Sequence, residues 1–90
     1  MLIFREKYDD ASYLYQASLL CCIRVLGPNH LTTGEVHMDF GNLFLKKNEK
    51  QQALQHFIEA YLIYKSYFED SSLHTAIAAK NIAILLEEKK

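Results

Sequence analysis

The chain repeats itself at an offset of 42 residues, and this repeat limits its fold more than any other feature. Residues 11–44 align with residues 53–86 without a gap. Small residues fall on small ones, as Gly41 does on Ala83, and large apolar residues fall on large apolar ones, as Tyr15 does on Phe57. Close approach of two helices demands small residues, so the small-on-small matches carry the most weight. A long repeat built from two helices is typical of a solenoid, in which each repeat packs on the next.

Turn residues divide the chain into helical segments. The run Gly27-Pro28-Asn29-His30 predicts a helix end, because glycine can take the left-handed cap and proline cannot continue the helix. Thr32 followed by Glu35 is a capping-box pattern that predicts a helix start near Thr32. Asn48 is a plausible stop, and a serine in residues 69–72 is expected to cap the helix after it. The sequence therefore predicts four helices, over residues 8–26, 32–47, 50–68 and 73–88.

Each predicted helix has one apolar face, with residues recurring every three or four positions. The first face comprises Tyr8, Ala11, Tyr15, Ser18, Cys22 and Val25, widened by Leu14, Leu19 and Leu26. The second comprises Val36, Phe40, Leu43 and Phe44. The third comprises Ala53, Phe57, Ala60, Tyr64 and Phe68. The fourth comprises Ala76, Ala79, Ile82, Ala83 and Leu86.

Three runs of residues share the pattern of a known repeat class. They are Lys7-Tyr8-Asp9-Asp10-Ala11 with Leu14-Tyr15 and Ser18-Leu19; Val25-Leu26-Gly27-Pro28-Asn29-His30-Leu31; and Asp39-Phe40-Gly41-Asn42-Leu43-Phe44, which returns as Asn81-Ile82-Ala83-Ile84-Leu85-Leu86. These runs resemble tetratricopeptide repeats of the kinesin light chain type, whose period exceeds the usual length of about 34 residues. The resemblance implies an all-α fold, a solenoid of antiparallel helix pairs. The second linker, residues 68–72, departs from the pattern because it lacks Gly-Pro, so the angle between the last two helices is not predicted.

The resemblance covers nearly all of residues 1–90, which we expect to form a single repeat region. Residues 1–5 match the end of a preceding helix and are expected to form its stub. The chain stops at Lys90, where the next outer helix of the pattern would begin. Repeat arrays usually need three or more units, so we expect this chain to be a fragment of a longer array.

Composition argues against several classes of function. The formal net charge is −1, so no general attraction to nucleic acid or to an anionic membrane is expected. The aromatic residues lack the interleaved basic residues of a base-stacking platform, and we interpret them as core. The adjacent Cys21 and Cys22 do not suggest a secreted disulfide framework. The apolar runs are too short to cross a membrane, and no targeting signal is evident, so a cytoplasmic location is expected.

No constellation of catalytic or metal-binding residues is evident. The four histidines, His30, His37, His56 and His74, have no zinc-ligand spacing, and the cysteines do not form a CxxC pair. We expect His30 to belong to the first turn and the other three to lie on helix surfaces. There is no GxSxG motif and no glycine-rich phosphate loop. The sequence therefore predicts a protein that is not an enzyme and holds no metal or cofactor.

The resemblance implies that the first helix of each pair lines a concave groove for a protein partner. It places ten residues there: Glu35, Met38, Asp39, Asn42, Lys46, Ile77, Lys80, Asn81, Ile84 and Glu88. The two asparagines can both donate to and accept from a peptide backbone, and the lysines can meet an acidic group. The hypothesis is a scaffold that binds a partner's peptide or helix in this groove. An alternative is a structural spacer or self-association module in a larger assembly, with a homo-dimer through exposed repeat ends. A minor third reading is a non-catalytic accessory domain of a large enzyme.

Overall fold

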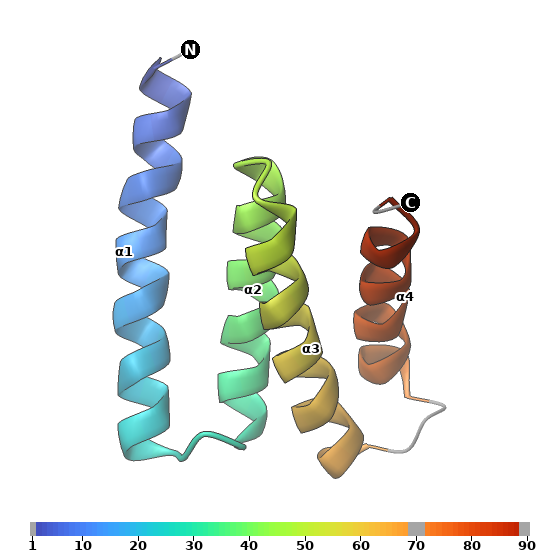
Figure 1. Cartoon of the computed structure of the whole chain (residues 1–90). Helices are drawn as coiled ribbons and strands as arrows, with labels where there is room; N and C mark the ends of the chain where they lie inside the picture. Colours follow the sequence, from blue (N-terminus) through green and yellow to red (C-terminus); the bar gives the residue numbers. More distant parts are fainter. Residues whose placement is uncertain (1, 69–71, 89–90) are drawn as a thin grey trace.

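The computed structural model describes residues 2–68 and 72–88, and the side chains of residues 8–68 and 72–87. Four helices follow one another: α1 (Leu2–Val25), α2 (Leu31–Lys46), α3 (Lys50–Tyr67) and α4 (Leu73–Glu88). They lie side by side in chain order, each antiparallel to the next, from α1 at one edge to α4 at the other (Figure 1). Each helix packs mainly against its neighbours in sequence, and α2 and α3 share the most extensive interface. The described residues thus form the predicted all-α array of helix pairs.

The first helix starts earlier than the sequence pattern suggested. α1 begins at Leu2, so residues 2–5 belong to this helix and do not form the end of a separate preceding one. The physical reason lies in residues 2–7, which contain neither glycine nor proline nor any other residue that favours a turn. Nothing in that segment interrupts the helical backbone.

Gly27 follows the end of α1 and adopts the predicted left-handed cap conformation. Its φ of +102° lies in the left-handed region, which glycine adopts without steric cost. The Gly27 amide donates hydrogen bonds to the carbonyl oxygens of Cys22 (3.0 Å) and Ile23 (3.1 Å). These bonds satisfy carbonyl groups that the end of the helix would otherwise leave unpaired.

The start of α2 differs from the predicted capping box. His30, not Thr32, is the N-cap residue, and its Nδ1 atom accepts a hydrogen bond from the Thr32 amide at 3.1 Å. The neighbouring Thr33 hydroxyl donates to the Gly27 carbonyl at 2.9 Å. The predicted capping box at Thr32 is wrong because the imidazole of His30 already occupies the capping position, whereas the helix starts at Leu31, near the expected residue. His30 does belong to the turn, as expected.

The remaining turns use the predicted residues. Asn48 has a φ of +66° and its amide donates to the Leu45 carbonyl at 3.0 Å, so it stops α2 as predicted. Ser72 caps α4, because its Oγ atom accepts a hydrogen bond from the His74 amide at 3.3 Å. The other residues of that predicted turn, 69–71, lie outside the described part of the chain.

The core is centred on α3, which is flanked by α2 on one side and α4 on the other. Its predicted face is confirmed: Ala53, Phe57, Ala60 and Tyr64 are buried, and Phe68 is half-buried. The predicted face of α2 is also confirmed, with its members buried or half-buried.

Two glycines allow α3 to approach α2 closely. A Cβ atom on Gly41 would lie 2.6 Å from Cε1 of Phe57, and one on Gly34 would lie 2.9 Å from Cγ2 of Ile63. Both distances are shorter than two carbon atoms tolerate, so only glycine fits these positions without a shift of the facing side chain or its helix. The interface therefore depends on the small residues that the repeat pattern singled out.

The predicted face of α1 is only partly covered. Tyr8, Ala11 and Tyr15 are half-buried, and the Tyr15 ring lies 6.0 Å from the Phe40 ring of α2. Ser18 and the widening residue Leu26 are exposed, however, and Leu14 and Val25 are 71% and 74% exposed. The prediction is wrong for these four residues because α1 packs against α2 on one side alone within the described chain.

The predicted face of α4 is shifted by one residue around the helix. Thr75, Ala78 and Leu85 are buried against α3, whereas the predicted Ala76, Ala79, Ala83 and Leu86 are exposed. Only Ile82 of the predicted set is partly buried in the core. The reason is again a single neighbouring helix, since α4 packs against α3 and the residues on its outer side have no partner helix among those described.

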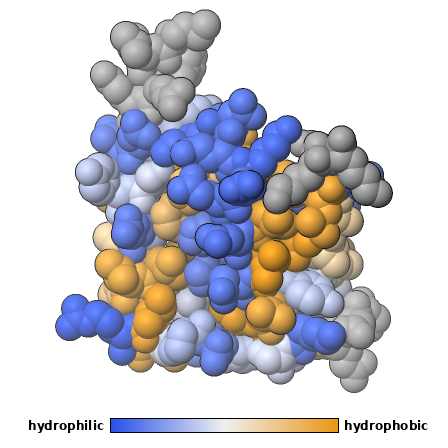
Figure 2. All heavy atoms as spheres, viewed as in Figure 1, coloured by the Kyte–Doolittle hydropathy of each residue, from blue (hydrophilic) through white to orange (hydrophobic). Residues whose placement is uncertain are grey.

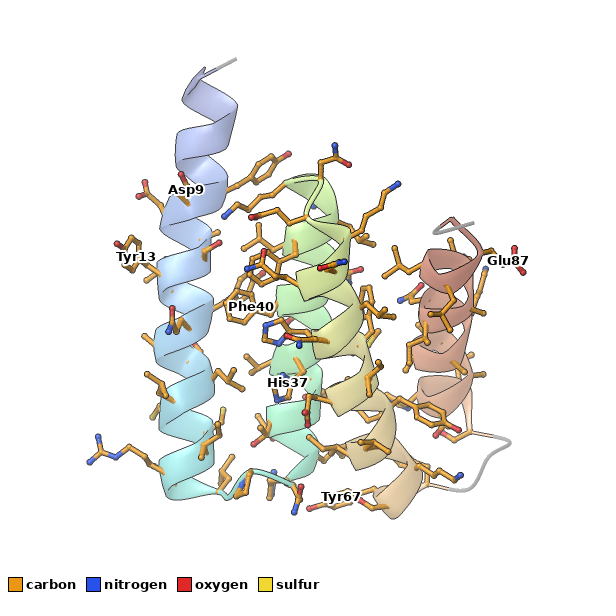
Figure 3. The ribbon with its side chains drawn as sticks, in the orientation of Figure 1. Asp9, Tyr13, His37, Phe40, Tyr67 and Glu87 are labelled. Carbon is orange, nitrogen blue, oxygen red and sulfur yellow. The ribbon has the colours of Figure 1, made fainter. Side chains whose placement is uncertain are left out.

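Apolar surface remains at both edges of the array as a consequence. Figure 2 shows it over α1 and over the side that α4 occupies, with a mainly hydrophilic band between them. Tyr13 of α1 points away from the other helices, and Phe40 of α2 points toward α1 (Figure 3).

Candidate partner-binding groove

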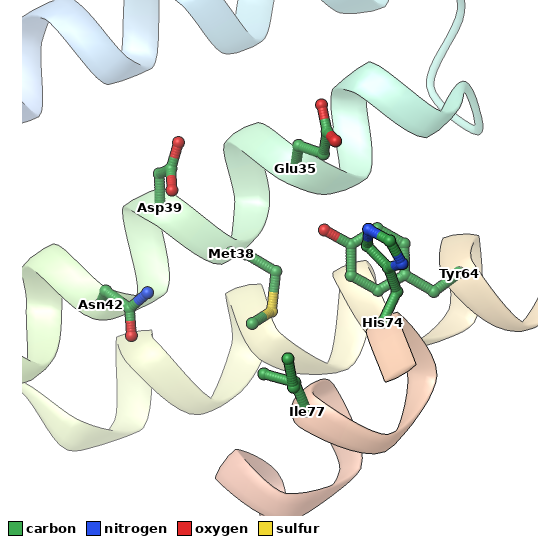
Figure 4. Close-up of a pocket in the computed structure, with 7 residues that line it drawn as sticks. All are labelled: Glu35, Met38, Asp39, Asn42, Tyr64, His74 and Ile77. Atoms are coloured by element: carbon green, nitrogen blue, oxygen red, sulfur yellow. The ribbon is translucent and has the colours of Figure 1, made fainter. Parts of the chain in front are cut away.

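A hollow of about 410 Å³ lies between the two equivalent helices α2 and α4 (Figure 4). Its wall is formed by α2 and the first turns of α4, and α3 contributes one residue from beneath. The lining residues are Glu35, Met38, Asp39, Asn42, Tyr64, His74 and Ile77. Five of the ten residues expected in the groove therefore border a single hollow.

The helix periodicity of α2 explains why four of its residues line this hollow. Glu35, Met38, Asp39 and Asn42 are spaced by three and four positions, which places them along one side of the helix. Ile77 reaches the same hollow from α4 because that helix starts at Leu73, directly after its Ser72 cap.

Met38 and Ile77 give the hollow two apolar sides that face each other (Figure 4). The Met38 side chain is half-buried and packs against the core residues Ala60, Tyr64 and Ala78. Ile77 is exposed and faces Met38 across the hollow (Figure 4). An apolar side chain of a partner would lose its contact with water here.

Tyr64 places a hydrogen-bond donor at the bottom of the hollow. The residue is 4% exposed, and its hydroxyl forms no hydrogen bond to any residue that the structure describes. Burial, together with the carboxylates of Glu35 and Asp39, raises the pKa of Tyr64 to about 12. The hydroxyl therefore stays protonated at neutral pH and can donate to an acceptor that enters the hollow.

His74 was not expected in the groove, and neither was Tyr64. The His74 ring stacks on Phe68 at 4.9 Å and meets the Tyr64 ring edge-on at 5.4 Å. Tyr64 was assigned to the buried face of its helix, but a tyrosine is long enough to show its hydroxyl beyond the core. The hydroxyl group of this otherwise buried residue was the feature in the sequence that could have indicated a place in the groove.

Four of the other five expected groove residues do not border this hollow. Lys46 lies exposed at the last turn of α2, and Lys80 and Ile84 are exposed farther along α4. Asn81 is half-buried, and the side chain of Glu88 lies outside the described residues. The structure thus brings together the first part of the predicted set and separates it from the rest.

His37 and His56 form a second polar feature, between α2 and α3. Their Nδ1 atoms are 3.0 Å apart, and the His56 ring stacks on Phe40 at 4.4 Å. The expectation that both lie on helix surfaces is wrong, since His37 is buried and His56 half-buried. Burial lowers the pKa of both, and the nearby His37 helps to bring that of His56 to about 4.

This pair borders another hollow, of about 510 Å³, with residues of the first turn on its rim. A hydrogen bond between two imidazoles requires one ring nitrogen to donate and the other to accept. Burial lowers the pKa of both rings, which favours the neutral form of each at neutral pH. Within the described part of the chain, no three potential ligands gather in a way that could hold a metal ion. We therefore interpret the pair as a packing contact.

Comparison with protein families identifies the repeat. The model described as tetratricopeptide repeat matches residues 1–66, and the chain belongs to this family. Comparisons with curated proteins and with solved structures gave no match. Helix α4 lies beyond the matched range, and its assignment as the equivalent of α2 depends on the 42-residue offset and on its place in the fold. The kinesin light chain type stays a prediction.

Family membership supports a general role. Tetratricopeptide repeats mediate protein–protein interaction and are typically scaffold elements without catalytic activity. None of the described helices is both long enough and apolar enough to cross a membrane. The fold and the family together define a helical repeat of the protein-binding class.

Proposed function

We propose that the hollow between α2 and α4 binds a segment of a partner protein. The observation that carries this proposal is the convergence of Glu35, Met38, Asp39, Asn42 and Ile77 on one hollow. These residues come from two helices that are equivalent in the repeat, and concave surfaces of this kind are the usual binding surfaces of solenoids.

The lining residues favour a particular chemistry in the partner. An apolar side chain fits between Met38 and Ile77, and a basic group is attracted by the exposed carboxylates of Glu35 and Asp39. The Asn42 side-chain amide can both donate a hydrogen bond to a peptide group and accept one from it. Lys46 and Lys80 do not border the hollow, so an acidic group would bind elsewhere on α2 or α4. The preferred segment is therefore apolar with a neighbouring lysine or arginine.

Charge reversal tests this proposal. The partner is first identified by affinity capture with the full-length parent protein, and its binding segment is then titrated by calorimetry. We expect Asp39→Lys to weaken binding at least tenfold, because it repels the basic group. The matched control is Glu87→Lys, since Glu87 points away from the other helices (Figure 3). Equal affinity of the two variants would contradict the groove.

The expected groove residues farther along α4 remain part of the proposal. Lys80, Asn81, Ile84 and Glu88 would contact a partner segment that continues past the hollow toward the end of α4. We also propose that the chain acts in the cytoplasm without a catalytic step of its own, which agrees with the scaffold role typical of the family. The alternative, a structural or self-association role, concerns the outer faces of α1 and α4 and not the groove.

A further inference from the structure

The interface between α2 and α3 is a template for a second interface that the described chain does not form. His56 of α3 lies in a box on α2 formed by His37, Phe40 and Phe44, with ring separations of 5.3, 4.4 and 5.5 Å. Two turns farther along α3, Ile63 lies over Gly34. These contacts define how the repeat receives its next helix.

At the offset of 42 residues, the residues equivalent to this contact lie on the two outer helices, α1 and α4. The residues equivalent to the box on α2 are Ala79, Ile82 and Leu86 of α4. The residue equivalent to His56 is Leu14 of α1, which is 71% exposed. Ala79 and Leu86 are exposed as well. The two halves of the contact therefore lie on opposite edges of one chain, and each lacks a partner helix among those described.

The residues equivalent to this contact differ from it on α1 and on α4 in a way that keeps the two faces complementary. In the template, a histidine meets a histidine and two aromatic rings. At the edges, Leu14 would meet Ala79, Ile82 and Leu86, so the polar pair and the ring stack are replaced together by an aliphatic cluster. A change on one side alone would leave an imidazole without its hydrogen bond, which costs free energy when buried.

The second contact of the template is matched in size. The residue equivalent to Gly34 is Ala76, which is one methyl group larger, and the residue equivalent to Ile63 is Cys21, which is smaller. Both are exposed. Ala83 is the exception, because it is one methyl group larger than the equivalent Gly41, whereas Tyr15 is as bulky as the equivalent Phe57. The two outer helices would therefore lie farther apart in this contact than α2 and α3 do.

We propose that this chain binds further copies of itself head to tail. The outer face of α4, defined as Ala76, Ala79, Ala83 and Leu86, receives the outer face of α1, defined as Leu14, Cys21 and Val25, from the next copy. The two faces differ, so the contact is heterologous and leaves one face of each kind free at the ends of an assembly. This predicts an open series of oligomers and not a closed dimer. It does not depend on the groove.

Sedimentation velocity in the presence of a reductant tests the proposal, since the reductant prevents a disulfide between exposed Cys21 residues. We expect the average mass of the unmodified chain to rise with concentration, past that of a dimer. Leu14→Glu blocks one face and Ala79→Glu blocks the other, so each variant alone is expected to stay monomeric. An equal mixture is expected to form a one-to-one dimer and nothing larger, because one intact face of each kind remains.

Other outcomes would overturn the proposal. A chain that is monomeric at every concentration shows that the edges do not bind copies of this chain. If Leu14→Glu still dimerises alone, the contact is α4 on α4, and if Ala79→Glu does so, it is α1 on α1. Tyr13→Glu is the matched control. Tyr13 is exposed like Leu14, but its equivalent on α3, Gln55, is exposed and so is not buried in the contact with α2. It is expected to associate like the unmodified chain. Circular dichroism checks that all variants are helical, and Asp39→Lys, which tests the groove, should leave self-association unchanged.

Discussion

His37 and His56 join α2 to α3 through their Nδ1 atoms, which lie 3.0 Å apart. One ring donates and the other accepts, and the lowered pKa of each favours the neutral state at neutral pH. It lies beside the stacked rings of Phe40 and Phe44, in the most extensive helix interface of the molecule. Its protonation should therefore affect the stability of the whole array.

We predict that the free energy of unfolding falls as the pH falls below about 6.5. The folded state holds the pKa of His56 near 4, and burial also lowers the pKa of His37, so the unfolded chain binds protons first. The stabilisation is complete above pH 6.5 and is lost progressively toward pH 4. Each unit of pKa shift corresponds to about 1.4 kcal/mol. Because His56 is only half-buried, solvent screening reduces the effect, and we expect a loss of about 1–2 kcal/mol.

Urea unfolding at pH 7.5 and pH 5 measures this loss. The control is the double variant His37→Ala with His56→Leu, which copies the Ala79 and Leu14 pair found at the offset of 42 residues. It should fold and lose most of the pH dependence in this range. The same decline in the double variant would show that other groups cause it.

Gly41 should be intolerant of a larger side chain. We predict that Gly41→Ala destabilises the fold by about 1–3 kcal/mol through overpacking, because its Cβ atom would lie 2.6 Å from the Phe57 ring. Helix propensity alone predicts the opposite sign, since alanine is favoured over glycine by about 1 kcal/mol. A double-mutant cycle with Phe57→Leu, read by urea unfolding, should show that the smaller side chain relieves part of the cost. Strict additivity would argue against this contact.

Lys47 connects α1 to the turn between α2 and α3. Its Nζ atom lies 3.0 Å from Asp9 and 3.4 Å from Glu49, and the hydrogen bond to Asp9 is the main cause that raises the pKa of Lys47. Asp9 is exposed, so we expect Lys47→Met to cost about 0.5–1 kcal/mol and to make stability less dependent on salt. Lys46→Met is the control, because Lys46 is exposed and forms no ion pair with any residue that the structure describes. Hydrogen exchange should show faster opening of α1 in Lys47→Met alone.

The two asparagines should contribute unequally to partner binding. Asn42 lines the hollow, whereas Asn81 is half-buried outside it. We predict that Asn42→Ala weakens binding of the partner segment by about 1–3 kcal/mol, if its peptide hydrogen bonds are lost, and that Asn81→Ala has a smaller effect. Calorimetric titration of both variants measures the difference. A larger loss in Asn81→Ala would move the binding surface toward the end of α4.

The sequence predicts the inner helices of this fold better than the outer ones. The faces of α2 and α3 follow from periodicity, because α2 has a helix on both sides and α3 lies between α2 and α4. Leu14 and Leu86 show where periodicity fails. Both continue an apolar stripe, yet both are exposed, since burial depends on a neighbouring helix that a sequence pattern does not specify.

The residues that line the hollow between α2 and α4 were predicted only in part, for a similar reason. Glu35, Met38 and Asp39 share one side of a single helix, which spacing reveals. The pairing of His37 with His56 joins two helices, and no local pattern fixes which side chains meet across such an interface. The Tyr64 hydroxyl reaches the hollow only because α2 and α4 leave space above it, which is a property of the assembled helices.

Methyl NMR of the chain with its captured partner segment tests the groove most directly. Met38 and Ile77 carry methyl groups on either side of the hollow, whereas Ile58 lies on the rim of the other hollow, beside His56. We predict that the signals of Met38 and Ile77 shift or broaden as the segment is added, and that the signal of Ile58 stays in place. Shifts at Ile58 with unchanged Met38 and Ile77 would contradict binding between α2 and α4.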